Sequence, residues 1–168
     1  MWQILRPRMY VGSIYDLDLA ALARSGLRGL ILDLDNTLVG WNRPDVSHEL
    51  GQWVERARAH ELKLCIVSNN LAERVERFAE KLGVMHIAQA GKPHRRAFRL
   101  AMGKMGTEIA TTAVVGDQLF TDILGGNRLR LYTILVRPVD DREFWFTRLV
   151  RRMERLVMAG LRQDLLHG

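Results

Sequence analysis

Residues 29–45 read GLILDLDNTLVGWNRPD, and this stretch places two carboxylates directly after an apolar run. Leu30-Ile31-Leu32 is continuously apolar, which is typical of a strand buried on both faces of a parallel sheet. Residues i and i+2 of an extended segment share a side, so Asp33 and Asp35 are expected to point the same way while Leu34 turns toward the core. We therefore expect a buried strand that brings two carboxylates to one edge of a sheet.

Further apolar runs alternate with amphipathic segments along the rest of the chain. The predicted strands cover residues 30–32, 62–67, 84–87, 113–115 and 132–136, and apolar residues recur at helical spacing over residues 50–57, 75–82, 98–105 and 119–129. Right-handed crossovers between parallel strands place helices on both faces of the sheet. The pattern predicts an α/β fold, a doubly wound, Rossmann-like parallel sheet of about five strands.

Composition is that of one globular domain, with 168 residues of which 48% are hydrophobic and 26% charged. The single cysteine, Cys65, excludes an internal disulfide and suits the core of a cytoplasmic protein. No apolar run reaches the roughly 20 residues of a membrane span, and Arg6-Pro7-Arg8 interrupts the N-terminal apolar residues before a signal-peptide core can form. The net charge of +6 favours an anionic partner: nucleic acid, a phospholipid surface or a phosphorylated substrate.

Polar residues follow four of the predicted strands, where the ligand crevice of such a sheet lies. One carboxylate of the first cluster can act as a nucleophile while its neighbour handles protons. A carboxylate about 3.5 Å from a phosphate dianion is repelled by roughly 9 kcal/mol at an effective dielectric constant near 20, so positive charge must be present. A hard cation on the aspartates and a lysine ammonium would offset this repulsion. The four clusters are Asp33, Asp35, Asn36 and Thr37; Ser68, Asn69 and Asn70; Lys92; and Asp117 with Asp122.

Four ordered segments carry a family resemblance: LDLDNTLVGWNRPD, IVSNN, KP and VVGDQLFTDILGGNRLRLYTILV. Together they resemble phosphatases of the haloacid dehalogenase (HAD) superfamily, and more narrowly subfamily IIIA, the YqeG-like and phosphatidylglycerophosphate phosphatases. The resemblance implies an HAD-like core and a Mg²⁺-dependent phosphomonoester hydrolase that works through an aspartyl-phosphate intermediate.

The same resemblance implies a role for each matching residue. Asp33 would be the nucleophile, and Asp35 would act first as general acid and then as general base. The implied Mg²⁺ ligands are Asp33, the backbone carbonyl of Asp35, and Asp117, with Asp122 as a supporting acid. The implied phosphate contacts are Thr37, Ser68, Asn69 and Lys92.

Some of these residues also have a purely structural interpretation. Ser68 and Asn69 are suitable turn or helix-capping residues, although capping and phosphate binding can coexist. Asp122 could be an ordinary acidic residue in the first turn of a helix. The pair Gly125-Gly126 predicts close helix packing or a kink, because no phosphate-binding glycine pattern surrounds it.

The resemblance also bears on the substrate. One predicted helix and one predicted strand fill each interval between Asp33, Ser68 and Lys92, so no cap domain fits. In this superfamily inserted caps close over small substrates, so a capless core implies an open site for a large or tethered phosphomonoester, or one lidded by a partner subunit. The favoured substrate is phosphatidylglycerophosphate, in phosphatidylglycerol biosynthesis. There are two alternatives. The first is a phosphatase that acts on a soluble or nucleic-acid phosphate, with nucleic acid less favoured. The second is a non-catalytic polyanion-binding protein.

The sequence predicts two parts, an HAD-like phosphatase domain at residues 1–140 and a C-terminal basic amphipathic helix at residues 141–168. From Phe144 to Leu161 apolar residues recur at helical spacing, and the arginines at 148, 151, 152 and 155 lie between them. Three placements are open: packing on the domain, a peripheral membrane contact, or a contact with nucleic acid or protein. The expected location is cytoplasmic, either free or peripheral at the membrane, and the sequence does not decide the oligomeric state.

Overall fold

The computed structural model describes residues 2–40 and 43–140, and the predicted C-terminal helix lies outside this part of the chain. A six-stranded parallel sheet forms its centre, with the strand order β1-β6-β5-β2-β3-β4. The strands are β1 (Met9–Val11), β2 (Gly29–Leu32), β3 (Lys63–Val67), β4 (Met85–Ile87), β5 (Thr112–Gly116) and β6 (Tyr132–Val136). The prediction of a parallel α/β sheet is confirmed.

The prediction of about five strands missed the edge strand β1. This strand has three residues, and its central Tyr10 is 60% exposed. It therefore lacks the continuous apolar run that marks a strand buried on both faces. The five predicted strands all form, and β2, at the centre, pairs with β3 on one side and β5 on the other.

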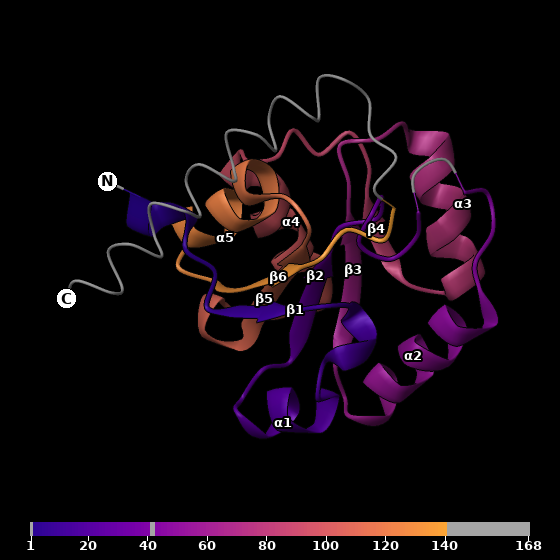
Figure 1. Cartoon of the computed structure of the whole chain (residues 1–168), viewed down its shortest axis with the longest axis horizontal. Helices are drawn as coiled ribbons and strands as arrows, with labels where there is room; N and C mark the ends of the chain where they lie inside the picture. The colour runs from indigo at the N-terminus through magenta and orange to yellow at the C-terminus, as the bar shows by residue number, and fades with distance from the viewer. Residues whose placement is uncertain (1, 41–42, 141–168) are drawn as a thin grey trace.

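Helices cover both faces of the sheet, as the doubly wound prediction requires. They are α1 (Leu19–Arg24), α2 (His48–Ala59), α3 (Ala72–Leu82), α4 (Arg95–Met105) and α5 (Leu124–Arg128). Figure 1 shows α2 and α3 on one side of the strands and α4 and α5 on the other. Leu30 and Leu32 of β2 pack in the cluster with α1, α2 and α3, whereas Ile31 packs in the cluster with α4.

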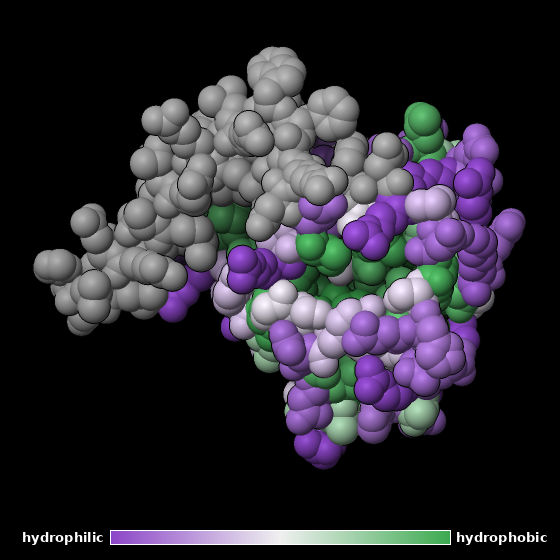
Figure 2. Space-filling model, turned by 45° about the vertical axis from the view of Figure 1, so that its right-hand side comes forward, coloured by the Kyte–Doolittle hydropathy of each residue, from purple (hydrophilic) through white to green (hydrophobic). Residues whose placement is uncertain are grey.

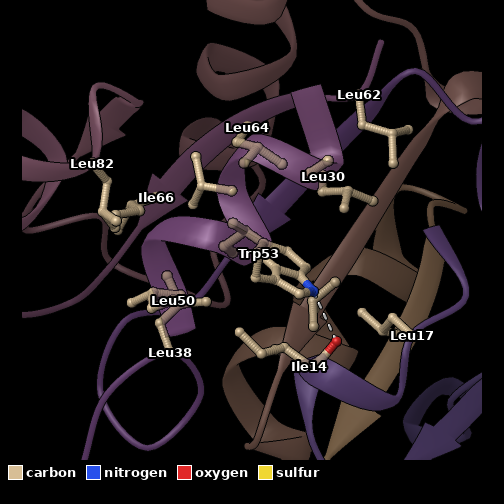
Figure 3. Packing of buried hydrophobic residues seen from close by; sticks show 14 of the residues in the cluster. Ile14, Leu17, Leu30, Leu38, Leu50, Trp53, Leu62, Leu64, Ile66 and Leu82 are labelled. Atoms are coloured by element: carbon tan, nitrogen blue, oxygen red, sulfur yellow. Dashed lines mark hydrogen bonds between the residues drawn. The ribbon is translucent and has the colours of Figure 1, made fainter. Parts of the chain in front are cut away.

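Trp53 of α2 is the largest side chain in the main core cluster. It is surrounded by aliphatic side chains from the sheet and the neighbouring loops (Figure 3), and its indole nitrogen Nε1 donates a hydrogen bond of 3.0 Å to the carbonyl of Ile14. A buried indole N–H needs such a partner. The bond also fixes the segment after β1 against α2.

Hydrophilic residues dominate the outer surface on the face drawn in Figure 2, and hydrophobic ones show mainly in a recess between them. Within residues 2–40 and 43–140, no helix combines the length and the hydropathy needed to cross a membrane. Cys65 is fully buried in the core, as expected.

The predicted helix at residues 119–129 has two parts. Residues Leu119–Ile123 form one π-helical turn, in which the N–H of Ile123 bonds to the carbonyl of Gln118, and α5 follows. The two glycines of α5 confirm the close packing predicted for them: a Cβ on Gly125 would lie 2.4 Å from the Phe98 ring, and one on Gly126 would lie 2.6 Å from the Thr133 side chain.

Candidate active site

The polar clusters that follow β2, β3 and β5 meet at one edge of the sheet, together with the loop between β4 and α4. Parallel pairing explains this, because the carboxyl ends of all the strands lie at that edge. Residues from these segments line a pocket of about 260 Å³: Asp33, Asp35, Ser68, Asn69, Asn70, Lys92, Gln118 and Thr121. Six of these eight residues belong to the polar clusters that the sequence predicted to line the ligand crevice.

The loop after β2 turns sharply just beyond the two aspartates. The backbone N–H groups of Leu38 and Val39 bond back to the carbonyl of Leu34, and Asn36 takes a positive φ of 63°. Leu34 is fully buried, as expected. This turn leaves Asp33 and Asp35 at the pocket, and the Thr37 hydroxyl lies within hydrogen-bond reach of two carboxylates, 3.3 Å from Asp117 Oδ1 and 3.5 Å from Asp33 Oδ2.

Lys92 is the central cation of the pocket. Its Nζ donates to Asp33 Oδ1 at 2.7 Å and to Asp122 Oδ1 at 2.6 Å, and its side chain is 3% exposed. Burial alone would lower the pKa of Lys92, but the charges of Asp122 and Asp33 and the bonds to them raise it above its usual value. The ammonium therefore stays charged at neutral pH.

Asn69 holds the backbone of Lys92 from both sides. Its Oδ1 accepts from the Lys92 N–H at 2.7 Å, and its Nδ2 donates to the Lys92 carbonyl at 3.2 Å. The phosphate contact predicted for the Asn69 side chain would have to compete with both bonds. The hydroxyl of Ser68 accepts from the N–H of Asn70 at 3.1 Å, which is the turn role considered from the sequence.

Three buried aspartates form an acidic group beside the lysine. Carboxylate oxygens of Asp33, Asp117 and Asp122 lie within 4.8 Å of one another. Burial raises the pKa of Asp122 to about 6, the charge of Lys92 opposes this rise, and Asp33 adds to it. A set of carboxylate oxygens suits a hard divalent cation such as Mg²⁺. The residues present therefore fit the metal that the sequence predicts.

Gly116 makes room for Asp122. A Cβ at this position would lie 2.2 Å from the Asp122 carboxylate, so only glycine fits without displacing that side chain. The wide π turn at residues 119–123 places Asp122 over the end of β5, where its Oδ2 also accepts from the Gln118 N–H at 3.3 Å. Asp122 is thus not an ordinary solvated acid of a first helical turn.

Comparison with known proteins agrees with this arrangement. The family model described as HAD-hydrolase-like matches residues 89–140. A solved structure of an uncharacterized protein from Listeria monocytogenes serotype 4b shares the fold with a TM-score of 0.55, at 19% identity over 70% of this chain and 85% of that one. The probable phosphatase YqeG of Bacillus subtilis (strain 168) is 41% identical over 157 residues, covering 94% of this chain and 91% of that protein. The chain belongs to the HAD phosphatase family.

A second relative is more distant. Phosphatidylglycerophosphate phosphatase 1, chloroplastic/mitochondrial, of Arabidopsis thaliana is 27% identical over 175 residues. That match covers 99% of this chain but 50% of the plant protein. The family resemblance predicted from the four motifs is confirmed.

The HAD motifs did not disclose every residue of the pocket. Gln118 and Thr121 line it but had no predicted role, although both stand inside the fourth motif. Arg74 was missed entirely: its guanidinium bonds Asp35 at 2.7 Å from the first turns of α3. The carboxylate of Asp35 points to Arg74 and Asn70, which leaves its backbone carbonyl as the predicted metal ligand. Asp122 lies beside Asp33 and Asp117, and its role as a supporting acid near the metal stays a prediction.

Proposed function

We propose that this HAD phosphatase hydrolyses phosphomonoesters through a covalent intermediate on Asp33. The observation that supports this most directly is the lysine bond to that carboxylate. Lys92 Nζ lies 2.7 Å from Asp33 Oδ1 at the pocket, and both residues are buried. The ammonium holds the nucleophile in place and offsets part of the repulsion between a carboxylate and a phosphate dianion, roughly 9 kcal/mol at about 3.5 Å.

Asp35 is the proposed general acid and base. In the first step its protonated carboxyl gives the proton to the leaving oxygen as the ester P–O bond breaks and the Asp33–phosphorus bond forms. In the second step the Asp35 carboxylate takes a proton from the water that attacks the phosphoenzyme. Free phosphate leaves, and both aspartates return to their starting forms.

The proposed metal ligands are the carboxylates of Asp33 and Asp117, with Asp122 beside them and the backbone carbonyl of Asp35 as a further oxygen. Bound Mg²⁺ would neutralise charge on the phosphoryl oxygens and orient the group. The Thr37 hydroxyl can donate to either Asp33 or Asp117 and so helps to orient these carboxylates. Thr37, Ser68, Asn69 and Lys92 are the proposed phosphate contacts.

The proposed substrate is phosphatidylglycerophosphate. The pocket, at about 260 Å³, is smaller than the sites of roughly 300–1,000 Å³ that enclose drug-sized ligands, so it suits a phosphorylated head group more than a whole lipid. Within residues 43–140, α2 and β3 precede Ser68, and α3 and β4 fill the interval from Ser68 to Lys92. These described segments hold no inserted cap domain, which suits a large or tethered phosphomonoester. The 27% identical plant phosphatase and the net charge of +6 also support an anionic lipid substrate. Such an enzyme would act in the cytoplasm, peripherally at a membrane.

The test is a comparison of kcat/KM values with Mg²⁺ on vesicle-borne phosphatidylglycerophosphate, nucleoside monophosphates, sugar phosphates and an aryl phosphate. We expect the lipid to give the highest value, and we expect EDTA to stop turnover on every substrate. A preference for a nucleotide or sugar phosphate would replace the lipid assignment and leave the mechanism standing. Turnover that survives EDTA would overturn the metal-assisted mechanism.

A further inference from the structure

Asp35 has a partner that comes from a different part of the chain. Arg74, on α3, donates to Asp35 Oδ1 through both Nε at 3.1 Å and Nη2 at 2.7 Å. The Arg74 side chain is 19% exposed, and that of Asp35 is 11% exposed. The pair is therefore partly shielded from water, where a charge-assisted double contact is strong and holds its geometry.

Arg74 is itself held at two further points. Its Nη1 donates to the carbonyl of Arg43 at 2.9 Å, and its guanidinium carbon lies 5.0 Å from the centre of the Phe78 ring, one turn further along α3. These contacts fix the guanidinium plane, so Asp35 meets a rigid partner instead of a mobile surface arginine.

The two oxygens of Asp35 have different surroundings. Oδ1 accepts two N–H donors from Arg74, which fills both of its lone pairs, and a guanidinium has no acceptor to receive a proton from that oxygen. Oδ2 accepts from Asn70 Nδ2 at 2.8 Å, which accounts for one of its two lone pairs. A proton on this carboxyl is therefore best placed on Oδ2.

We propose that Arg74 is the positioning residue that commits Oδ2 of Asp35 to proton transfer. This inference rests on the proposed function, in which Asp35 is the general acid and base. The Oδ2 proton goes to the leaving oxygen when the ester P–O bond breaks, and Oδ2 regains a proton from the attacking water when the phosphoenzyme is hydrolysed. Arg74 exchanges no proton in either step; it keeps Oδ1 occupied and the carboxyl plane fixed.

The experiment measures phosphoenzyme formation in single turnovers for an alkyl phosphate and for p-nitrophenyl phosphate. The variants are Arg74→Met, Arg74→Lys, Asp35→Asn and the double variant Arg74→Met with Asp35→Asn. Arg77→Met is the matched control, because Arg77 lies on the same helix, its side chain is 52% exposed, and it pairs with Glu73 at the surface. Thermal unfolding of each variant reports whether the fold is kept.

A positioning role has a specific signature. A poor leaving group needs the acid and a good one does not, so Arg74→Met should slow the alkyl phosphate by about 10- to 100-fold and the aryl phosphate by less than about threefold. In the Asp35→Asn background the same change should alter the rate by less than about twofold, because the two residues act as one unit. Arg74→Lys should not restore the rate, since the single nitrogen of an ammonium cannot reproduce the planar fork of Nε and Nη2. Arg77→Met should match the parent.

Equal losses on both esters, or an effect of Arg74→Met that persists undiminished in the Asp35→Asn background, would show a merely structural role and overturn the inference. If Arg74→Met fails to fold, Arg74→Lys carries the same comparison of leaving groups. Asp35→Asn separates the two levels of the argument. If this variant itself loses equally on both esters, the proposed acid role of Asp35 fails; if it shows the leaving-group effect and the Arg74 variants do not, only the inference about Arg74 fails.

Discussion

Replacing Lys92 with methionine should destabilise the folded state strongly, because Met fills a similar volume but carries no charge. The change removes contacts of 2.7 Å to Asp33 and 2.6 Å to Asp122, and it leaves three buried carboxylates within 4.8 Å of one another without their ammonium. Breaking a buried ion pair from one side costs about 3–5 kcal/mol of unfolding free energy. We expect the lower end of this range, since Asp122, whose pKa is already raised to about 6, can take up a proton.

Urea unfolding in EDTA at neutral pH measures this loss. The matched control is Lys81→Met: Lys81 is 46% exposed and pairs with Asp45 at 3.1 Å on the surface, so its loss should change stability by less than about 1 kcal/mol. Added Mg²⁺ should narrow the deficit of Lys92→Met, because a cation on the carboxylates replaces part of the missing charge. If Lys92→Met and Lys81→Met were equally stable in EDTA, Lys92 would not be needed to balance the charge of the three buried aspartates, and this reasoning would be refuted.

Three further predictions concern other parts of the chain. Gly116→Ala should cost at least about 2 kcal/mol of stability in urea unfolding and abolish most phosphatase activity, because its Cβ would meet the Asp122 carboxylate at 2.2 Å. At Gly51 an added Cβ would meet nothing within 4 Å beyond the adjoining backbone of its own helix, so Gly51→Ala should be neutral or stabilising. Burial raises the pKa of the Cys65 thiol to about 12, so at pH 8 a thiol reagent should modify Cys65 only after unfolding. Rapid labelling of the folded protein would contradict the position of Cys65 in the core. If residues 144–161 form an interfacial helix, reversing the charges of Arg148, Arg151, Arg152 and Arg155 should weaken salt-sensitive binding to phosphatidylglycerol vesicles. The same change should lower activity on vesicle lipid but not on an aryl phosphate. Unchanged binding would exclude the interfacial helix and leave the other two placements of this segment.

The sequence predicted the central strands well because these strands are buried on both faces. Leu30 to Leu32 and residues 113–115 form unbroken apolar runs, and a run of this kind in an alternating chain has few other interpretations. The edge strand β1 has water on one side, so its residues carried no such signal. The long helices could be predicted from the spacing of their buried apolar residues. The π turn at residues 119–123 could not, since Asp122 within it accepts a buried hydrogen bond from Lys92, a partner elsewhere in the chain.

The same distinction holds for the candidate site. Asp33, Lys92 and Asp117 follow strand ends that the sequence shows, so their meeting at one edge could be predicted. The role of Arg74 could not be predicted, because Arg74 lies on a helix 39 residues from Asp35. In the sequence it resembles any arginine on the polar face of an amphipathic helix. Arg77, on the same helix, has the same appearance in the sequence, but it pairs with Glu73 at the surface. Only the path of α3 past the loop after β2 tells the two apart.

The central claim is that Asp33 accepts the phosphoryl group. The most direct measurement is rapid quenching of the enzyme during turnover, followed by mass spectrometry of the peptide that carries Asp33 and by treatment with hydroxylamine, which cleaves acyl phosphates. We expect a phosphate on Asp33 that hydroxylamine removes, and none in Asp33→Asn, which should be inactive while its thermal unfolding stays close to that of the parent. Normal turnover with no phosphorylated aspartate, or a phosphate on another residue, would contradict it.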